Sequence, residues 1–297
     1  MPTENVHGDS RLSLWLRVRE YAVPASMIET ATARRSAGDW AGACAAAGVD
    51  VDLDLRFLAR SRGRELAARI RADLRHLAPD LLRWHLPRIA PDGLLRPGLT
   101  STLARYDTAA GDDPHAVRPV HTVYLVARTA PAWADGGQRI SLALWDGSRS
   151  EHGRLGDPRH GPRPDRRFRL DLHRHLWDAR RTDELRVRSG ADRPPAEGLP
   201  PLDPELLAAL PQGHRCAVDR WAAEAGILLR AEGRTSGSVA VRLGARQRLV
   251  LDLAADGPGP PAARIGAAPA DRGAPRRARP PPAGGWPPGA GAGAPPG

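Results

Sequence analysis

The chain has 297 residues, and a hydrophobic content of 41% is enough to bury a substantial core in one large domain or two modest ones. It contains no lysine, so all 44 basic residues are arginine; they stand against 34 acidic residues and give a net charge of +10. The absence of lysine excludes the enzyme classes that need an amine side chain, such as phosphate-loop nucleotidases, Schiff-base enzymes and Ser-Lys hydrolases. Because Ala, Gly, Pro and Arg are all abundant, a GC-rich genome explains part of the positive charge without any selection for binding.

Residues 10–90 show the periodicity of helices. Four apolar residues recur at helical spacing before a break at Pro79: Leu66, Ile70, Leu74 and Leu77. Between two earlier helices, Gly38 is expected to end one helix and Asp39 to cap the start of the next.

Three carboxylates alternate within residues 49–55: Asp50, Asp52 and Asp54. On a strand they would face one way and could bind a cation. We favour the alternative that they serve the first turn of the helix that follows, where the helix dipole stabilises negative charge.

The periodicity changes after about residue 98. Four short stretches are rich in β-forming residues or alternate between polar and apolar residues, and we predict that they are antiparallel strands: residues 98–106, 119–128, 139–147 and 166–173. Residues 175–189 and 214–233 have helical character. A hairpin is expected over residues 238–253.

These patterns predict an α+β fold with three regions. Residues 1–95 form a helical region, residues 96–256 form an α+β region in which helices pack on antiparallel strands, and residues 257–297 form a disordered Pro/Ala/Gly-rich tail. We expect no membrane span and no secretory leader. With only two cysteines, Cys44 and Cys216, neither a disulfide framework nor a cysteine zinc site is indicated, which favours the cytoplasm.

The positive charge is concentrated in residues 149–188, which carry 12 arginines and 7 acidic residues. Within residues 159–181, seven arginines form a candidate nucleic-acid-binding cluster: Arg163, Arg166, Arg167, Arg169, Arg174, Arg180 and Arg181. Guanidinium groups suit phosphate oxygens, which supports this interpretation. The interleaved acids and the scarcity of aromatic residues for base stacking count against it.

The same segment offers a candidate metal site. If residues 166–173 are a strand that continues past its end, then Asp171, His173 and His175 lie on one face. Two imidazoles and a carboxylate are ligands that a hydrolytic metal ion uses, so a metal-dependent hydrolase is one hypothesis. The alternative is an amphipathic strand whose basic outer face is simply solvated.

Two long stretches, residues 26–55 and 73–99, resemble uncharacterised proteins of high-GC bacteria. The resemblance implies a cytoplasmic bacterial setting and brings no activity with it.

The functional expectation comes by elimination. The sequence has no G-x-S-x-G, G-x-G-x-x-G or H-E-x-x-H motif, and Cys44 has neither a basic nor a polar neighbour to activate it. We therefore predict a non-catalytic accessory or adaptor protein that has no cofactor and binds another protein. Nucleic-acid binding through the arginine cluster is the first alternative, and the metal-dependent hydrolase is the second.

Overall fold

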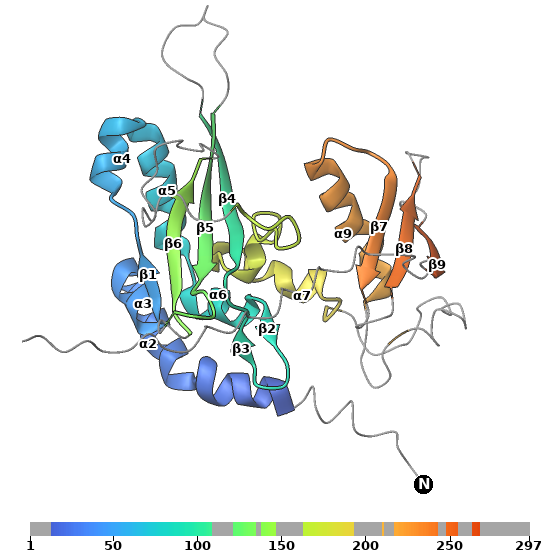
Figure 1. Ribbon diagram of the computed structural model, residues 1–297, viewed down its shortest axis with the longest axis horizontal. Coiled ribbons are helices and arrows are strands. Elements are labelled where there is room, and N and C mark those ends of the chain that lie inside the picture. The colour runs from blue at the N-terminus through green and yellow to red at the C-terminus, as the bar shows by residue number, and fades with distance from the viewer. Residues whose placement is uncertain are drawn as a thin grey trace, which may run out of the picture.

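The computed structural model describes residues 13–108, 121–134, 138–146, 163–192, 210, 217–242, 248–254 and 263–267. These residues form helices and mixed sheets, so the predicted α+β fold class is confirmed. The larger body contains a four-stranded sheet and the N-terminal helices, and a smaller unit of helix α9 and a three-stranded sheet lies beside it (Figure 1). No helix in the described part of the chain is long and apolar enough to cross a membrane.

Helices occupy most of the N-terminal part, as predicted. A helical segment at residues 13–22, which ends in the π-helical turn η1 (Val18–Ala22), is followed by α2 (Ala25–Ser36), α3 (Trp40–Ala46), α4 (Leu55–Ser61), α5 (Arg64–His76) and α6 (Pro79–His85). Asp39 caps α3 as expected, because its carboxylate accepts a hydrogen bond of 2.8 Å from the backbone of Gly42. Pro79 is the first residue of α6, where its missing N–H costs nothing.

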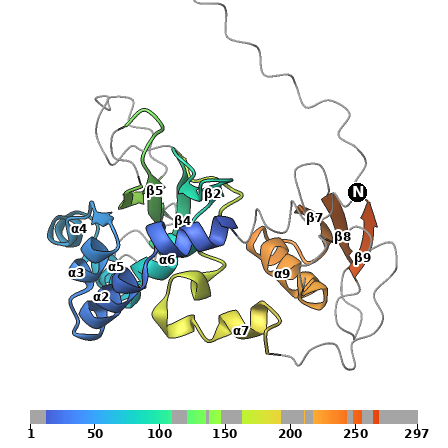
Figure 2. The same cartoon turned by 90° about the horizontal axis from the view of Figure 1, so that it is seen from below.

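The main core lies between these helices and the sheet, and the helices lie on one side of the sheet (Figure 2). The apolar stripe of α5 is buried as predicted: Leu66, Ile70 and Leu74, with Leu77 just beyond the helix. It belongs to the same buried cluster as Leu125 and Leu142 of the sheet. Removing each such side chain from water stabilises the fold by about 1.5–3 kcal/mol.

The main sheet has the strand order β1-β6-β5-β4. Its strands are β1 (Val49–Val51), β4 (Thr100–Thr108), β5 (His121–Thr129) and β6 (Ile140–Trp145). The last three form the predicted antiparallel meander.

For residues 49–55 we favoured the first turn of a helix over a strand, but the structure has strand β1 at residues 49–51. Val49 pairs in parallel with Ile140 of β6, so residues 49–51 extend the sheet and do not belong to a helix. Of the three alternating carboxylates, only Asp54 does what was expected: it caps α4 by accepting hydrogen bonds from Arg56 and Phe57. Asp50 instead pairs with Arg139 beside β6.

A buried arginine joins three distant parts of the larger body. Arg83 of α6 is 7% exposed, and its guanidinium donates to the carbonyl oxygens of Ala22, Ala47 and Gln138 at 2.8, 3.4 and 2.6 Å. Burial lowers the pKa of Arg83. These carbonyl dipoles replace the water that the charge would otherwise hold.

After α6 the chain makes a small hairpin of β2 (Arg88–Ile89) and β3 (Leu94–Leu95). Gly93 in its turn has a positive φ of 74° and lies against the N-terminal helical segment. A β-carbon at Gly93 would come within 2.8 Å of the Val18 side chain, so both conformation and space require glycine there.

The predicted strand at residues 166–173 is wrong, whereas the helical character predicted for residues 175–189 is present as three short helices and not as one continuous helix. Residues 163–192, here called the bridging segment, run as turns followed by η3 (Arg174–Leu176), η4 (Ala179–Arg181) and the short α7 (Glu184–Arg188). The segment pairs with β4 at one β-bridge, Thr102 to Arg169, and through backbone hydrogen bonds to Thr100 and Thr102. It then turns inward to bury Trp177 completely. The indole N–H of Trp177 donates to the carbonyl of Leu170, which holds the turn closed.

The smaller unit agrees with the sequence except at its end. Helix α9 (Val218–Ala231) packs on β8 (Arg248–Leu253), which pairs with β7 (Gly237–Arg242) as the predicted hairpin. Strand β9 (Ala263–Ala267) also pairs with β8, so this part of the predicted disordered tail has regular structure. Residues 268–297 lie outside the described part of the chain.

Candidate functional site

The bridging segment carries every site residue that the sequence suggested. It runs from the edge of β4 to the smaller unit (Figure 1). Residues 159–162 of the predicted arginine cluster lie outside the described residues.

The structure does not bring the three candidate metal ligands together. The carboxylate of Asp171 accepts two hydrogen bonds of 2.8 Å from the guanidinium of Arg169. His173 and His175 turn instead toward Arg188, whose terminal nitrogens lie 3.0 and 2.8 Å from their Nδ1 atoms. The described residues contain no group of three or more His, Cys, Asp or Glu side chains placed to hold a metal ion. The shared strand face on which this hypothesis depended is absent because the segment is not a strand.

These histidines belong to a cluster that links the two bodies of the molecule, the His–Arg–Glu cluster of His173, His175, Arg188 and Glu224. Arg188, at the end of α7, donates from Nε to Glu224 of α9 at 2.7 Å. Because a guanidinium has only donors, both Nδ1 atoms must accept, and both imidazoles must be neutral. Burial, followed by the charge of Arg188, lowers the pKa of His175 to about 4 and also lowers that of His173.

Four of the seven predicted arginines are neutralised by carboxylates. Arg169 binds Asp171, Arg181 binds Glu184, and Arg174 and Arg180 both bind Asp178. Arg163, Arg166 and Arg167 are exposed, and within the described residues no carboxylate pairs with them. The predicted cluster therefore separates into a structural group and an uncompensated group.

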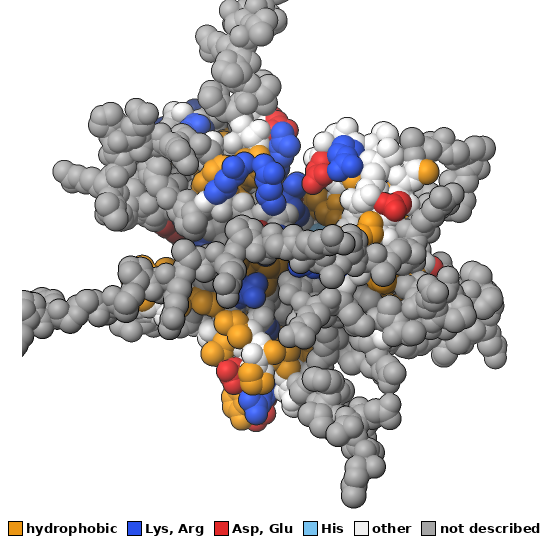
Figure 3. All heavy atoms as spheres, turned by 45° about the vertical axis from the view of Figure 1, so that its right-hand side comes forward, with side chains coloured by type: hydrophobic (Ala, Val, Ile, Leu, Met, Phe, Trp, Pro, Cys, Tyr) orange, Lys and Arg blue, Asp and Glu red, His pale blue; other side chains and the backbone are white. Residues whose placement is uncertain are grey.

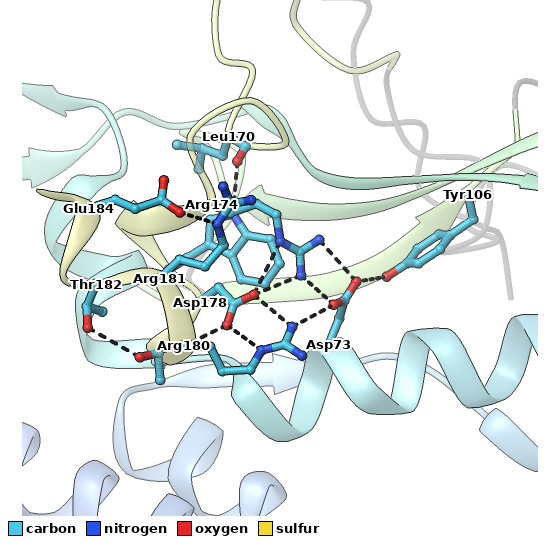
Figure 4. Close-up of polar contacts among 11 residues, drawn as sticks. Asp73, Tyr106, Leu170, Arg174, Asp178, Arg180, Arg181, Thr182 and Glu184 are labelled. Carbon is cyan, nitrogen blue, oxygen red and sulfur yellow. Dashed lines mark hydrogen bonds and ion pairs between the residues drawn. The ribbon is translucent and has the colours of Figure 1, made fainter. Parts of the chain in front are cut away.

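Within the structural group, Arg174 and Arg180 belong to a network centred on the buried carboxylate of Asp178 (Figure 4). Asp178 has no exposed surface and accepts hydrogen bonds from Arg174 at 2.9 Å and from Arg180 at 3.0 Å. Arg174 also pairs with Asp73 of α5, which accepts a 2.6 Å hydrogen bond from the hydroxyl of Tyr106. The guanidinium of Arg174 lies 4.5 Å from the ring centroid of Trp177.

Opposite charges balance inside this network. Burial works against ionisation of Asp178, but hydrogen bonds from Arg180 and Arg174 outweigh it and lower its pKa. Burial is also the largest influence on Arg174, yet its contacts with Asp73 and Asp178 raise its pKa. Both groups are thus held in their charged forms, and the network acts as a brace between α5, β4 and the bridging segment.

Cys44 does not offer a reactive thiol. It is 1% exposed within the main core, and burial, followed by the charge of Asp39, raises the pKa of its thiol to about 12. The thiolate required for nucleophilic attack is therefore scarce at neutral pH. Cys216, the other cysteine, lies outside the described residues.

A second candidate site is apolar. Four large hydrophobic side chains on adjoining elements are at least 41% exposed, and we call them the apolar surface: Trp15, Leu16, Ile89 and Leu94. Ile89 and Leu94 pair directly across β2 and β3, so their side chains leave the hairpin on the same side. Hydrophobic side chains gather on the lower lobe in Figure 3, at the height of this hairpin in Figure 1.

The sequence did not identify the apolar surface, because nothing in the local pattern indicates that Trp15 stacks on Trp84 while staying 42% exposed. Function has to be argued from these surfaces alone, because no family model, curated protein or solved structure matches the chain.

Proposed function

We propose that this protein is a non-catalytic accessory protein that binds a protein partner through the apolar surface. The carrying observation is the exposure of Leu16 at 60% and of the cross-strand pair Ile89 and Leu94 at 41% and 48%. Exposed apolar side chains that lie on adjoining elements mark interaction sites more often than single exposed apolar side chains do.

The apolar surface is pre-organised for binding. Trp15 is fixed by stacking on Trp84 at a centroid distance of 5.2 Å, and the hairpin is fixed against the helical segment by Gly93. A side chain that is already ordered loses little entropy on binding, and tryptophan is among the residues that contribute most at interfaces. Because these side chains are already about half-buried, each one that a partner covers contributes on the order of 1 kcal/mol before the entropy cost of association.

The proposal includes a cytoplasmic location. The described cysteine, Cys44, is a free buried thiol, which suits a reducing compartment. The resemblance to proteins of high-GC bacteria agrees with a bacterial cytoplasm.

The test is affinity purification of the tagged full chain from its native cells after nuclease treatment, followed by mass spectrometry. We expect a protein partner that is retained by the wild type and lost when Leu16→Ser and Leu94→Ser are combined. The matched control is Phe57→Ser, which makes the same kind of change at a 48% exposed apolar residue on α4.

Retention of the same partner by the double variant would contradict the role of the apolar surface. A chemical turnover by the purified wild-type chain would contradict the non-catalytic proposal.

A further inference from the structure

The bridging segment begins with a turn that presents arginines to solvent, here called the arginine turn (residues 163–168). The carboxylate of Asp165 accepts a 2.9 Å hydrogen bond from the backbone N–H of Arg167, and the carbonyl of Asp165 accepts one of 3.2 Å from Phe168. Arg166 and Arg167 therefore occupy the two central positions of a tight turn, where side chains point outward.

The turn is fixed to the main sheet. The backbone N–H of Asp165 donates to the carbonyl of Thr100 at 2.8 Å, and that of Asp171 donates to Thr102 at 2.9 Å. Both acceptors are on β4. The exposed guanidinium groups of Arg166 and Arg167 thus stand on a backbone that is anchored on both sides, which reduces the entropy lost when they bind, whereas Arg163 precedes the first anchor.

The charges on this turn are uncompensated, in contrast to those that follow it. Asp165 is used by the backbone, and within the described residues no carboxylate binds the side chains of Arg163, Arg166 or Arg167. In Figure 3, basic side chains gather above the centre of the view, on the lobe that borders the gap between the two upper lobes. Three exposed guanidinium groups on six consecutive residues make a local positive field that no carboxylate of the described residues neutralises.

We infer that the arginine turn binds the phosphate backbone of a nucleic-acid duplex. Arginine forks match phosphate oxygens, and a duplex carries about one negative charge per 1.7 Å of its axis, so adjacent arginines find several phosphates at once. Phe168, the aromatic residue of the turn, is half-buried and cannot stack freely on a base. The contacts are therefore to the backbone and independent of base sequence.

This inference does not depend on the proposed function. The apolar surface consists of residues of the N-terminal helical segment and the β2–β3 hairpin. The arginine turn is a different segment, whose backbone is hydrogen-bonded to β4.

The experiment measures binding of the full chain to fluorescent duplexes of about 20 base pairs by anisotropy, between 50 and 200 mM salt, with DNA and RNA duplexes of the same sequence. We expect log K to fall against log salt with a slope of about −3, because three phosphate contacts contribute about −0.9 each. Changing Arg163→Gln, Arg166→Gln and Arg167→Gln together should remove this slope and weaken binding on the order of 100-fold at 0.1 M salt. If the protein binds one duplex more tightly than the other, the result supports the inference and shows whether DNA or RNA is the preferred polymer.

The matched control removes the same charge elsewhere. Arg64, Arg71 and Arg75 lie on one exposed side of α5, and no carboxylate pairs with them among the described residues. The variant with all three changed to Gln should bind within about threefold of the wild type, since loss of net charge alone changes only the long-range field. A variant with Lys at residues 163, 166 and 167 should keep the slope, because lysine also binds phosphate.

Three results would overturn the inference. If the affinity of the wild type does not change with salt, the protein makes no phosphate contacts. If the α5 variant loses as much affinity as the variant of the arginine turn, the turn is not the binding site. Equal competition by polyglutamate at matched charge would show that the turn recognises carboxylates on an acidic protein and not phosphates.

Discussion

At the scale of single residues, we expect the carboxylate of Asp178 to make a large contribution to the free energy of unfolding. Its carboxylate has no exposed surface and neutralises both Arg174 and Arg180. We expect Asp178→Ala to lower the free energy of unfolding by about 3–5 kcal/mol, because it leaves the partly buried guanidinium of Arg174 and that of Arg180 to share one remaining carboxylate, Asp73. Urea unfolding followed by circular dichroism measures this loss.

The control pair lies in the same segment. Arg181 and Glu184 are also joined by an ion pair, but both are exposed to water. Glu184→Ala should cost less than about 1 kcal/mol, since a surface ion pair gains little over hydration. Equal losses for the two variants would show that burial does not set the strength of these pairs.

At the scale of elements, the His–Arg–Glu cluster couples α7 to α9, and its histidines make that coupling sensitive to acid. Above about pH 6.5, His175 is neutral in both the folded and the unfolded chain and has no effect on stability. Below that pH the unfolded chain takes up a proton, while the folded chain resists until about pH 4. Stability must therefore fall over this window, by about 3 kcal/mol at its lower end.

The measurement compares the free energy of unfolding at pH 7 and pH 4.5 in the wild type and in His175→Asn. The asparagine oxygen can accept from Arg188 in place of Nδ1 but does not titrate, so the variant should lose the part of the decrease that His175 supplies. His173 and His85, whose pKa values burial also lowers, supply the remainder. Carboxylates with lowered pKa values, such as Asp178 and Glu224, affect stability mainly below this window. An unchanged decrease in the variant would exclude His175 as its source.

The elements also show what the sequence can and cannot predict. Helix α5, strands β4 to β6 and the β7–β8 hairpin follow from patterns that are complete within a few residues. Strand β1 does not, because Val49 finds its partner Ile140 only in the folded chain.

The candidate site was harder to predict for the same reason. Alternating polar residues in the bridging segment suggested a strand, but Arg174 is satisfied by Asp73 and Arg188 by Glu224, each far away in the chain. The sequence located the arginine-rich segment correctly. Only the three-dimensional pairing separates the arginines that brace the fold from those that face water.

At the scale of the whole molecule, there are two cores. The main core joins the helices to the four-stranded sheet, and a small second core consists of Ala225, Leu229, Leu251 and Leu253. We expect Leu251→Ala to destabilise the smaller unit by about 2–5 kcal/mol, because it opens a cavity in a core with few other contacts. Amide hydrogen exchange should increase in α9, β7 and β8 and stay unchanged in β5.

The reciprocal variant, Leu125→Ala in β5, should increase exchange in the main sheet. Faster exchange of β5 in the Leu251→Ala variant would mean that the two cores open as one unit.

Arg83 has a consequence for the order in which the chain can fold. A lone cation stays hydrated until other acceptors surround it, and its acceptors are the carbonyls of Ala22, Ala47 and Gln138. The N-terminal helices leave the ribosome well before Gln138 is made. Until then the guanidinium of Arg83 keeps part of its hydration, so this corner of the core can close only after all three segments have been made.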